Sequence, residues 1–529
     1  MLWFGDSIRP IDWGISEAMA ALRGLLRDWR HKPLQKIRLR RSLVLKSIPD
    51  MDTYDFVVIG GGSAGYTAAS TAAALGLKTL CIDGGKEIGG LCILRGCMPS
   101  KTLIESANRF LTLRRAEEFG LSAGHLGYNA EAIIARKRRL IGEFADYRAQ
   151  QLRKGPFDFQ RGTAEFIDPH TLRIRVLVGG ERIVRAKTAV ITTGSVINMI
   201  DLPGLPEIGF VHSELALDSM RIPKSVILLG GGAIALEFAH FYEALGTKVT
   251  ILQRSSQVLK EADVDVAEAA VSALRHRGVE VICGTKLLRA EPSGTAKRIV
   301  YEKGSRENFV EAEEVFYALG RQAFVEGLNL PAAGVKGTDM CPIESNAAMQ
   351  TSQPHIFTAG DATGMHEVVH IAIQQAGVAA RNAARVLKGE RLEEIDYRLK
   401  LFCIFCEPQI AMVGLTEKEA AERSINVRVA KYQFADHGKS MIRGETDGFV
   451  KLIVEAATGE IIGGAVVGPE GADLIHEISV AMHFRATAAT LAAVPHYHPT
   501  LSEIWTYPAE GLAPTTPAAP TLPTAKGPR

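Results

Sequence analysis

Two cysteines and a lysine in the segment GGLCILRGCMPSK (residues 89–101) have the residue types and spacing of a redox site. Cys92 and Cys97 follow a glycine pair and precede a proline, so the backbone must turn tightly and then begin a helix. We expect Cys97 at the helix start, where unpaired N–H groups and the helix dipole favour a thiolate. Lys101 would lie on the same face of that helix. The pattern predicts a reactive thiol pair, with a structural disulfide or two buried thiols as the alternatives.

Length, charge and apolar runs limit the class of protein. A chain of 529 residues exceeds one hydrophobic core and predicts roughly three or four domains. Its formal net charge of +2 argues against a nucleic-acid partner. The apolar runs are too short for a transmembrane helix, and the first residues lack the basic start of a signal peptide. We therefore expect a cytoplasmic protein.

The two ends of the chain differ from the rest. In residues 1–50, Ser16 can cap a helix with an apolar stripe, and a basic cluster follows. Such a segment can contact an anionic membrane surface; packing on its own protein or loose order are the alternatives. Residues 513–529 are rich in Pro, Ala and Thr, which predicts a disordered tail.

A glycine-rich turn after an apolar run predicts a first dinucleotide site. The run FVVIG is typical of a buried parallel strand, and Gly60, Gly62 and Gly65 follow in a GxGxxG turn before an alanine-rich helix. Without side chains there, the backbone can approach a pyrophosphate at the helix N-terminus. The next strand ends in Asp83, which is suitably spaced to bond a ribose hydroxyl.

The same pattern returns at residues 225–246, with Gly230, Gly232 and Ala235 in the turn. Two such units in one chain predict two bound dinucleotides.

The residues after the next strand of this second unit bear on the choice of nicotinamide. Gln253 stands where an NAD site would carry an acid, and Arg254 and Lys260 follow it. An acid would bond the 2′-hydroxyl and repel a 2′-phosphate, whereas arginine favours the phosphate. The sequence predicts NADPH; NADH remains the alternative if both cations are ordinary solvated charges.

From residue 52 to 511 the chain resembles the pyridine nucleotide–disulfide oxidoreductases, which include dihydrolipoamide dehydrogenase, glutathione reductase and mercuric reductase. The segment with Cys92 and Cys97 is similar to the redox-disulfide loop of that family, GGTCxNxGCxPSK. Departures occur at Leu91, Leu94 and Arg95. The resemblance implies an α/β fold with two Rossmann-like dinucleotide-binding domains, for FAD and NAD(P), and an α+β C-terminal dimerisation domain.

The same resemblance implies a domain order along the chain. The FAD-binding domain would comprise residues 51–200 and 336–395, and the NAD(P)-binding domain residues 201–335. The dimerisation domain would comprise residues 396–512, between the two ends already described.

The resemblance also implies roles for the redox residues. Cys97 would face the flavin and Cys92 would exchange with the substrate. Glu237 in the second unit would pair with Lys101 and hold it beside the flavin. An exposed helical Glu237 is the alternative, although its neighbours are apolar.

The segment HYHPTLSEIW (residues 496–505) is close to the HxHPTxSE pattern of the family. The resemblance makes His498 the acid–base for the substrate thiol and Glu503 its orienting partner, acting on the disulfide of the neighbouring subunit in a homodimer. As an alternative, Thr500 and Glu503 have the spacing of a capping box.

Further residues are assigned to the cofactors by resemblance. Asp361 in IFTAGDAT would bind the ribitol of FAD, and Gly90, Lys101 and Ala164 would also belong to the FAD site. Gly320 in YALGR belongs to a segment that would close over the nicotinamide nucleotide.

Other chemistry-bearing residues leave alternatives open. Cys403 and Cys406 form a CxxC without a second ligand pair, so we expect buried thiols and no metal site. Arg95, between the redox cysteines, would favour an anionic disulfide if it faces the substrate, but it can equally point to solvent.

The sequence therefore predicts a flavin disulfide reductase acting on a dihydrolipoamide-like dithiol or a related small-molecule or lipoyl disulfide. A mercuric-type metal-ion reductase is a second reading, disfavoured because the C-terminal tail lacks cysteines. A redox-sensing flavoprotein attached to a membrane through residues 1–50 is a third.

Overall fold

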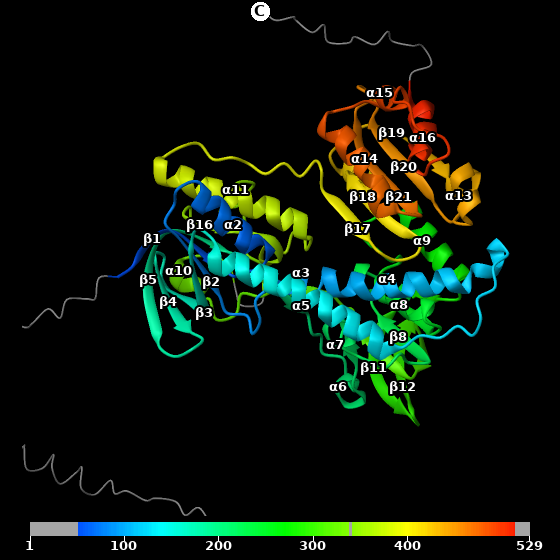
Figure 1. The fold of residues 1–529 in the computed structure, drawn as a ribbon, viewed down its shortest axis with the longest axis horizontal. Helices are drawn as coiled ribbons and strands as arrows, with labels where there is room; N and C mark the ends of the chain where they lie inside the picture. Colours follow the sequence, from blue (N-terminus) through cyan, green and yellow to red (C-terminus); the bar gives the residue numbers. More distant parts are fainter. Residues whose placement is uncertain (1–50, 338–340, 514–529) are drawn as a thin grey trace, which may run out of the picture. The chain divides into compact units, whose positions relative to one another are not determined.

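A six-stranded sheet with β1 (Thr53–Ile59) inside it carries the first glycine turn (Figure 1). Strand β1 pairs in parallel with β2 (Thr79–Asp83) and β5 (Glu181–Ile191). The other strands are β3 (Asp158–Asp168), β4 (Thr171–Val176) and β16 (Ile356–Thr358). The run FVVI of β1 is buried because elements cover both faces of the sheet, as expected for parallel strands.

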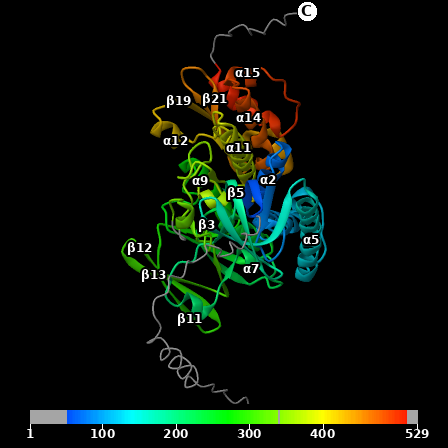
Figure 2. The same cartoon turned by 90° about the vertical axis from the view of Figure 1, so that its left-hand side faces the viewer.

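Helices α2 (Ser63–Ala74) and α11 (Val369–Lys388) lie side by side against this sheet (Figure 2). The alanines of α2 that face the interior are fully buried, and their small side chains let α11 approach closely. Helix α11, far along the chain, thus packs on the helix that follows the first glycine turn.

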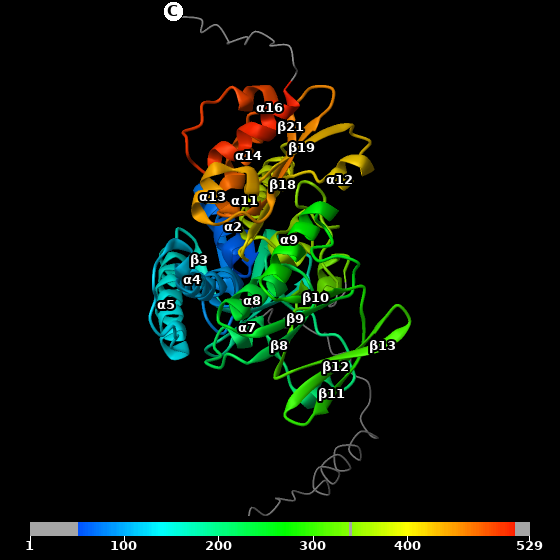
Figure 3. The same ribbon diagram turned by 90° about the vertical axis from the view of Figure 1, so that its right-hand side faces the viewer.

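The second glycine turn follows β8 of a five-stranded parallel sheet with the order β10-β9-β8-β14-β7. Its strands are β7 (Val211–His212), β8 (Ser225–Leu229), β9 (Lys248–Gln253), β10 (Glu280–Cys283) and β14 (Glu314–Tyr317). Helices α8 (Ala233–Ala244) and α9 (Val264–His276) pack beside it (Figure 3). An antiparallel sheet adjoins it, formed by β11 (Lys286–Ser293), β12 (Ala296–Lys303) and β13 (Arg306–Ala312).

Three helices lie between β2 and β3. The redox segment is on α3 (Gly90–Leu94) and the start of α4 (Cys97–Arg114), and α5 (Ala130–Lys154) follows them. Short elements complete these two parts of the chain. They are η1 (Ala116–Phe119), β6 (Ser195–Ile197), α6 (Leu205–Ile208), α7 (Ser213–Ala216), β15 (Arg321–Ala323), α10 (Leu330–Ala333) and η2 (Gly360–Thr363).

The C-terminal part forms a five-stranded antiparallel sheet with the order β17-β18-β21-β20-β19. Its strands are β17 (Leu401–Ile404), β18 (Gln409–Gly414), β19 (Val427–Gln433), β20 (Phe449–Glu455) and β21 (Ile461–Gly468). Strands β20 and β21 pair as an antiparallel hairpin whose turn contains Gly459. The helices here are α12 (Glu417–Glu422), η3 (Phe434–Asp436), α13 (Gly438–Arg443), α14 (Gly471–His483), α15 (Ala488–Ala492), η4 (Ser502–Trp505) and α16 (Thr506–Leu512).

This computed structural model describes residues 51–337 and 341–513. The predicted N-terminal basic helix and almost all of the predicted Pro-rich tail lie outside the described residues. Among the helices that are described, none is long and apolar enough to cross a membrane. The α/β fold class with two glycine-turn domains and a C-terminal α+β domain is confirmed.

Candidate active site

The two redox-segment cysteines meet at the start of a long helix. Cys97 is the first residue of α4, which has no side-chain cap and no acid in its first turn. A hydrogen bond from Cys92 and the charge of Lys101 lower the pKa of Cys97 to about 7, against the effect of burial. The same hydrogen bond, with burial, raises the pKa of Cys92. Both are free cysteines in this structure, so Cys97 is the thiolate and Cys92 the thiol near neutral pH.

An ion pair next to these cysteines joins the two glycine-turn domains. Lys101 Nζ donates to both carboxylate oxygens of Glu237, at 2.7 and 2.8 Å. The Glu237 side chain is only 7% exposed, so the alternative of a solvated glutamate is wrong. The carboxylate of Glu237 compensates the positive charge of Lys101 in this partly buried position.

Phe405 belongs to the same group and was missed by the sequence analysis. Its backbone N–H donates to Glu237 Oε1 at 3.2 Å, and its ring centroid lies 4.9 Å from Lys101 Nζ. In the segment FCIFC, only the two cysteines indicate chemistry from the sequence. Nothing in that string shows that its second phenylalanine covers a lysine more than three hundred positions earlier.

Cys403 and Cys406 flank this contact as free thiols. Burial raises the pKa of Cys403 to about 11 and raises that of Cys406 further. Cys406 Sγ donates to the carbonyl of Pro408 at 3.1 Å. These are the properties of unreactive thiols, in line with the buried-thiol prediction.

His498 and Glu503 form a second pair. His498 Nδ1 lies 2.9 Å from Glu503 Oε2, and the His498 side chain is 77% exposed. Buried His437 approaches the other carboxylate oxygen, with Nε2 at 3.5 Å from Oε1. The turn η4 has no side-chain cap, so the alternative reading of Thr500 and Glu503 as a capping box is not supported. Glu503 instead holds an exposed imidazole between protein and solvent, and none of the described contacts of His498 reaches Cys92 or Cys97 of its own chain.

The glycines of the first glycine turn lie so close to neighbouring backbone atoms that a side chain at Gly60 or Gly65 would not fit. A Cβ on Gly60 would lie 2.3 Å from the carbonyl oxygen of Thr192, and one on Gly65 would lie 1.7 Å from that of Gly60. Gly62 and Gly90 face one another so closely that a Cβ on Gly90 would come within 2.7 Å of Gly62 Cα. The N-terminus of α2 has no side-chain cap and no acid. Its N–H groups can therefore bind a pyrophosphate.

Two carboxylates near this turn, those of Asp83 and Asp361, are suited to accept hydrogen bonds from cofactor hydroxyl groups. Asp83 Cβ is 3.0 Å from the position of a Cβ on Gly61, and burial raises the pKa of Asp83. Asp361 Oδ2 accepts from Ser195 Oγ at 2.6 Å. Thr193 Oγ1 is shielded from water without a partner among the described residues. These residues fit FAD, whose sugar and ribitol hydroxyls would complete them.

Ala164 and Gly320 are the remaining residues that the resemblance assigned to the cofactors. Neither has a polar side chain. Ala164 is buried on β3. Gly320 has φ +104°, a conformation that favours glycine, directly before β15.

The second glycine turn resembles the first but differs from it in two residues, Ala235 and Gln253. A Cβ on Gly230 would lie 2.3 Å from the carbonyl oxygen of Ala318, whereas one on Gly232 would meet nothing within 4 Å. Gln253 Cβ lies 3.2 Å from the position of a Cβ on Gly231, as Asp83 does at the first turn. Buried Ala235 stands where the first turn has Gly65. The second site therefore presents an amide where the first presents an acid.

Two cations follow Gln253 in different environments. Arg254 is exposed and makes no ion pair in the part of the chain that the structure describes. Lys260 Nζ lies 3.3 Å from Glu261 Oε1 and is also exposed. Of these two cations, Arg254 is therefore the more available to bind a 2′-phosphate.

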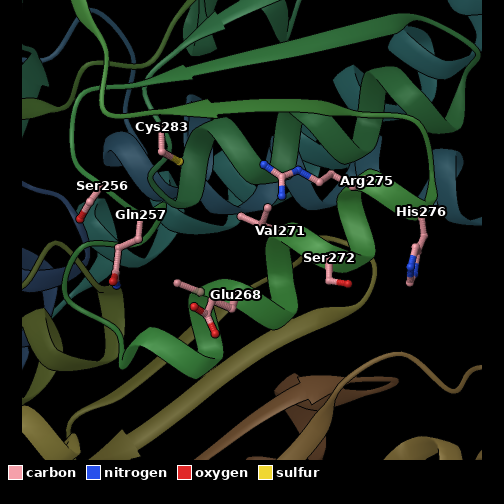
Figure 4. Close-up of a pocket in the computed structure, with 9 residues that line it drawn as sticks. Ser256, Gln257, Glu268, Val271, Ser272, Arg275, His276 and Cys283 are labelled. Atoms are coloured by element: carbon pink, nitrogen blue, oxygen red, sulfur yellow. The ribbon is translucent and has the colours of Figure 1, made fainter. Parts of the chain in front are cut away.

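A hollow of about 420 Å³ lies beside the loop after β9 (Figure 4). Its walls include Ser256 and Gln257 from that loop, Glu268 and Arg275 from α9, and Cys283 from β10. It contains none of the residues that the sequence assigned to the site.

Arg95 is held by two carboxylates. Its Nη2 lies 3.0 Å from Glu87 Oε2, and its Nε 3.9 Å from Glu214 Oε2. Two carboxylates therefore offset its charge, which weakens the prediction that Arg95 selects an anionic substrate.

Comparisons with known proteins cover nearly all described residues. The family described as "Pyridine nucleotide-disulphide oxidoreductase" matches residues 54–376, and its dimerisation domain matches residues 402–509. The dihydrolipoyl dehydrogenase of Bacillus subtilis is 34% identical over 462 residues, 85% of this chain and 96% of that protein. That of Chlorobaculum tepidum is 35% identical over 454 residues, 85% and 95% of the two chains.

Two solved structures are similar over comparable lengths. LpdA from Mycobacterium tuberculosis has a TM-score of 0.78 at 26% identity, over 88% of this chain and 100% of that one. The HOCl-induced flavoprotein disulfide reductase of Escherichia coli has a TM-score of 0.74 at 25% identity, over 86% and 99%.

Proposed function

The chain belongs to the pyridine nucleotide–disulfide oxidoreductase family, and we propose that it passes electrons from NADPH through FAD to Cys92 and Cys97 and then to a lipoyl-type disulfide. The protein is an FAD-dependent disulfide oxidoreductase that also uses a nicotinamide dinucleotide. The observation that carries the residue assignment is the hydrogen-bonded thiol pair beside the ion pair of Lys101 and Glu237.

The residues around the flavin position would have separate roles. FAD, when bound, supplies two-electron transfer between the nicotinamide and the disulfide. The glycine turn with Gly60 and Gly62 would hold its pyrophosphate, and Asp83 and Asp361 would bind its hydroxyl groups. Lys101, held by Glu237, would place a positive charge where negative charge develops.

The disulfide step uses both cysteines. The partner subunit's His498 takes the proton of Cys92, whose sulfur attacks one sulfur of the substrate, and the substrate S–S bond breaks as a mixed disulfide forms. The departing sulfur takes a proton from the partner subunit's His498. Cys97 then attacks Cys92 Sγ, which releases the second substrate thiol and closes the Cys92–Cys97 disulfide. Both thiols would be restored by an electron pair from NADPH, for which bound FAD would supply the two-electron chemistry.

Assembly and nucleotide choice complete the proposal. Residues 402–509 form a dimerisation domain, and the protein forms a homodimer. We propose that each site combines the cysteines of one subunit with the partner's His498, which the exposure of this histidine supports. Preference for NADPH is supported by Gln253 and Arg254. The domain division given by the resemblance and a cytoplasmic location belong to the same proposal.

Turnover of purified protein tests this function. We expect NADPH-dependent reduction of oxidised lipoamide by the wild type, and loss of that activity in Cys92→Ser with FAD retained. Stimulation of NADPH oxidation by mercuric ion, without lipoamide turnover, would instead support the metal-ion reductase reading. Full lipoamide turnover by Cys92→Ser would overturn the assignment of the redox pair.

A further inference from the structure

Arg148 on α5 is a partly buried arginine that forms no ion pair with an acid among residues 51–337 and 341–513. Its Nε and Nη1 are shielded from solvent, and neither donates a hydrogen bond among the described residues. Gln151, three positions on and therefore on the same helix face, also has a shielded Oε1 without a partner. Buried polar atoms normally have partners, so this face is arranged for a group that the chain itself does not provide.

Several other basic residues of α5 form ion pairs. Arg138 Nε lies 3.2 Å from Asp218 Oδ1, and Arg139 Nη1 lies 2.8 Å from Glu143 Oε1. Arg148 differs because its guanidinium carbon lies 4.3 Å from the ring centroid of Tyr66 on α2. Stacking on an aromatic ring holds the guanidinium plane without neutralising its charge.

Arg148 lies in the neighbourhood of Cys92, the cysteine that exchanges with the substrate in the proposed function. Helix α5 packs against α3, which carries Cys92. Burial lowers the pKa of Arg148, and the charges of Tyr66 and Cys92 act against that effect. Arg148 and Cys92 are therefore close enough to interact electrostatically. Tyr66, which lies beneath the guanidinium, begins the second turn of the helix after the first glycine turn.

We propose that Arg148 is a specificity-determining residue that binds an anionic group of the disulfide substrate beside Cys92. This rests on the proposed function and deepens it, because it names anionic disulfides as the preferred class. Arginine remains charged at any working pH and offers a fork of donors that matches a carboxylate. Arg95, although nearer in sequence, has its charge offset by Glu87 and Glu214.

A pair of substrates that differ in one charge tests the proposal. Lipoate and lipoamide share the dithiolane ring, and only lipoate carries a carboxylate. We expect Arg148→Gln to lower kcat/KM for lipoate about tenfold more than for lipoamide, an effect that weakens at high salt. Arg148→Lys should retain part of the preference. Arg139→Gln, with the same change in net charge on the same helix, and Arg95→Gln should leave the lipoate-to-lipoamide ratio unchanged. FAD content should equal that of the wild type in every variant.

Alkylation of the reduced enzyme provides a readout that needs no turnover. Iodoacetate is anionic and iodoacetamide neutral, so the ratio of their rates at Cys92, followed by peptide mass spectrometry, reports the local charge. We expect this ratio to fall in Arg148→Gln and not in Arg139→Gln. An unchanged ratio, or loss of FAD on removal of Arg148, would overturn the inference. A lowered ratio in a protein that reduces no disulfide would overturn the proposed function alone.

Discussion

Lys101 and Glu237 connect the redox helix α4 to helix α8 of the second glycine-turn domain through an ion pair of 2.7 Å. The pair lies close enough to Cys97 for both charges to act on its thiol: Lys101 lowers the pKa of Cys97 and Glu237 raises it. The two partners of one ion pair therefore have opposite effects on the same sulfur.

This relationship predicts opposite shifts on titration. Because the pKa of Cys97 is lowered to about 7, its thiolate should be present above that pH and should disappear as the pH falls through it. Lys101→Met should move the midpoint upward, and Glu237→Gln should move it downward. Thiolate absorbance of the reduced protein, followed against pH, measures both. Shifts in the same direction would contradict the assignment of charges.

The fold was largely predictable because its determinants are local. Gly60, Gly62 and Gly65 follow an apolar run and precede an alanine-rich helix, so strand, turn and helix are each encoded within a short window. The hairpin around Gly459 is encoded in the same way. The fully buried Lys451 on β20 is different, because the acids that satisfy it lie on α9 and α12, far along the chain.

Lys451 yields a stability prediction. Its Nζ lies 2.7 Å from Asp263 Oδ2, 2.8 Å from Asp265 Oδ1 and 3.0 Å from Glu417 Oε1. Lys451→Met removes the buried cation from these carboxylates, of which Asp265 keeps only its pair with Lys431, and should cost about 3–5 kcal/mol, seen as a lower Tm. Lys431→Met, at a more exposed lysine that also pairs with Asp265, is the matched control and should cost less.

The three carboxylates that remain in Lys451→Met should bind a divalent cation, and this binding provides a second test of the cluster. Their ligand atoms lie within 4.8 Å of one another. Added Ca²⁺ should therefore restore part of the lost Tm in Lys451→Met and none in Lys431→Met. An equal Tm for Lys451→Met and the wild type would show that the cluster does not hold β20 to α9.

Nucleotide preference should depend on the residues after β9. Gln253→Glu combined with Arg254→Ala introduces an acid for the 2′-hydroxyl and removes a cation for the 2′-phosphate. We expect the ratio of kcat/KM for NADPH to that for NADH to fall by about tenfold or more. Lys260→Ala should have a smaller effect, since Glu261 already pairs with that lysine. A wild-type enzyme with much higher kcat/KM for NADH would refute the preference itself.

Sharing of the active site predicts complementation between subunits. His498→Gln alone should lower disulfide turnover about 10²–10⁴-fold, as expected for loss of an acid–base group. A mixed dimer of one His498→Gln subunit and one Cys92→Ser subunit should recover about half of the wild-type activity, because one of its sites keeps both functional residues. An inactive mixed dimer would place the histidine and the cysteine of each site in the same chain.

The site was predictable only where a motif spans it. Cys92, Cys97 and Lys101 lie within one segment, so their types and spacing were enough. Phe405 and Arg148 reach the same region from distant elements, and a single phenylalanine or arginine carries no signal in a sequence. The environment of Arg95 likewise depends on Glu214, which only the fold brings near it.

Anaerobic reduction by NADPH tests most directly whether Cys92 and Cys97 form a redox disulfide in series with FAD. The oxidised wild-type protein should take up twice as much NADPH per FAD as Cys92→Ser, because the disulfide and the flavin each accept an electron pair. The variant should retain the flavin and its reduction by NADPH. Equal uptake by the two proteins would contradict the account, since electrons would then stop at the flavin.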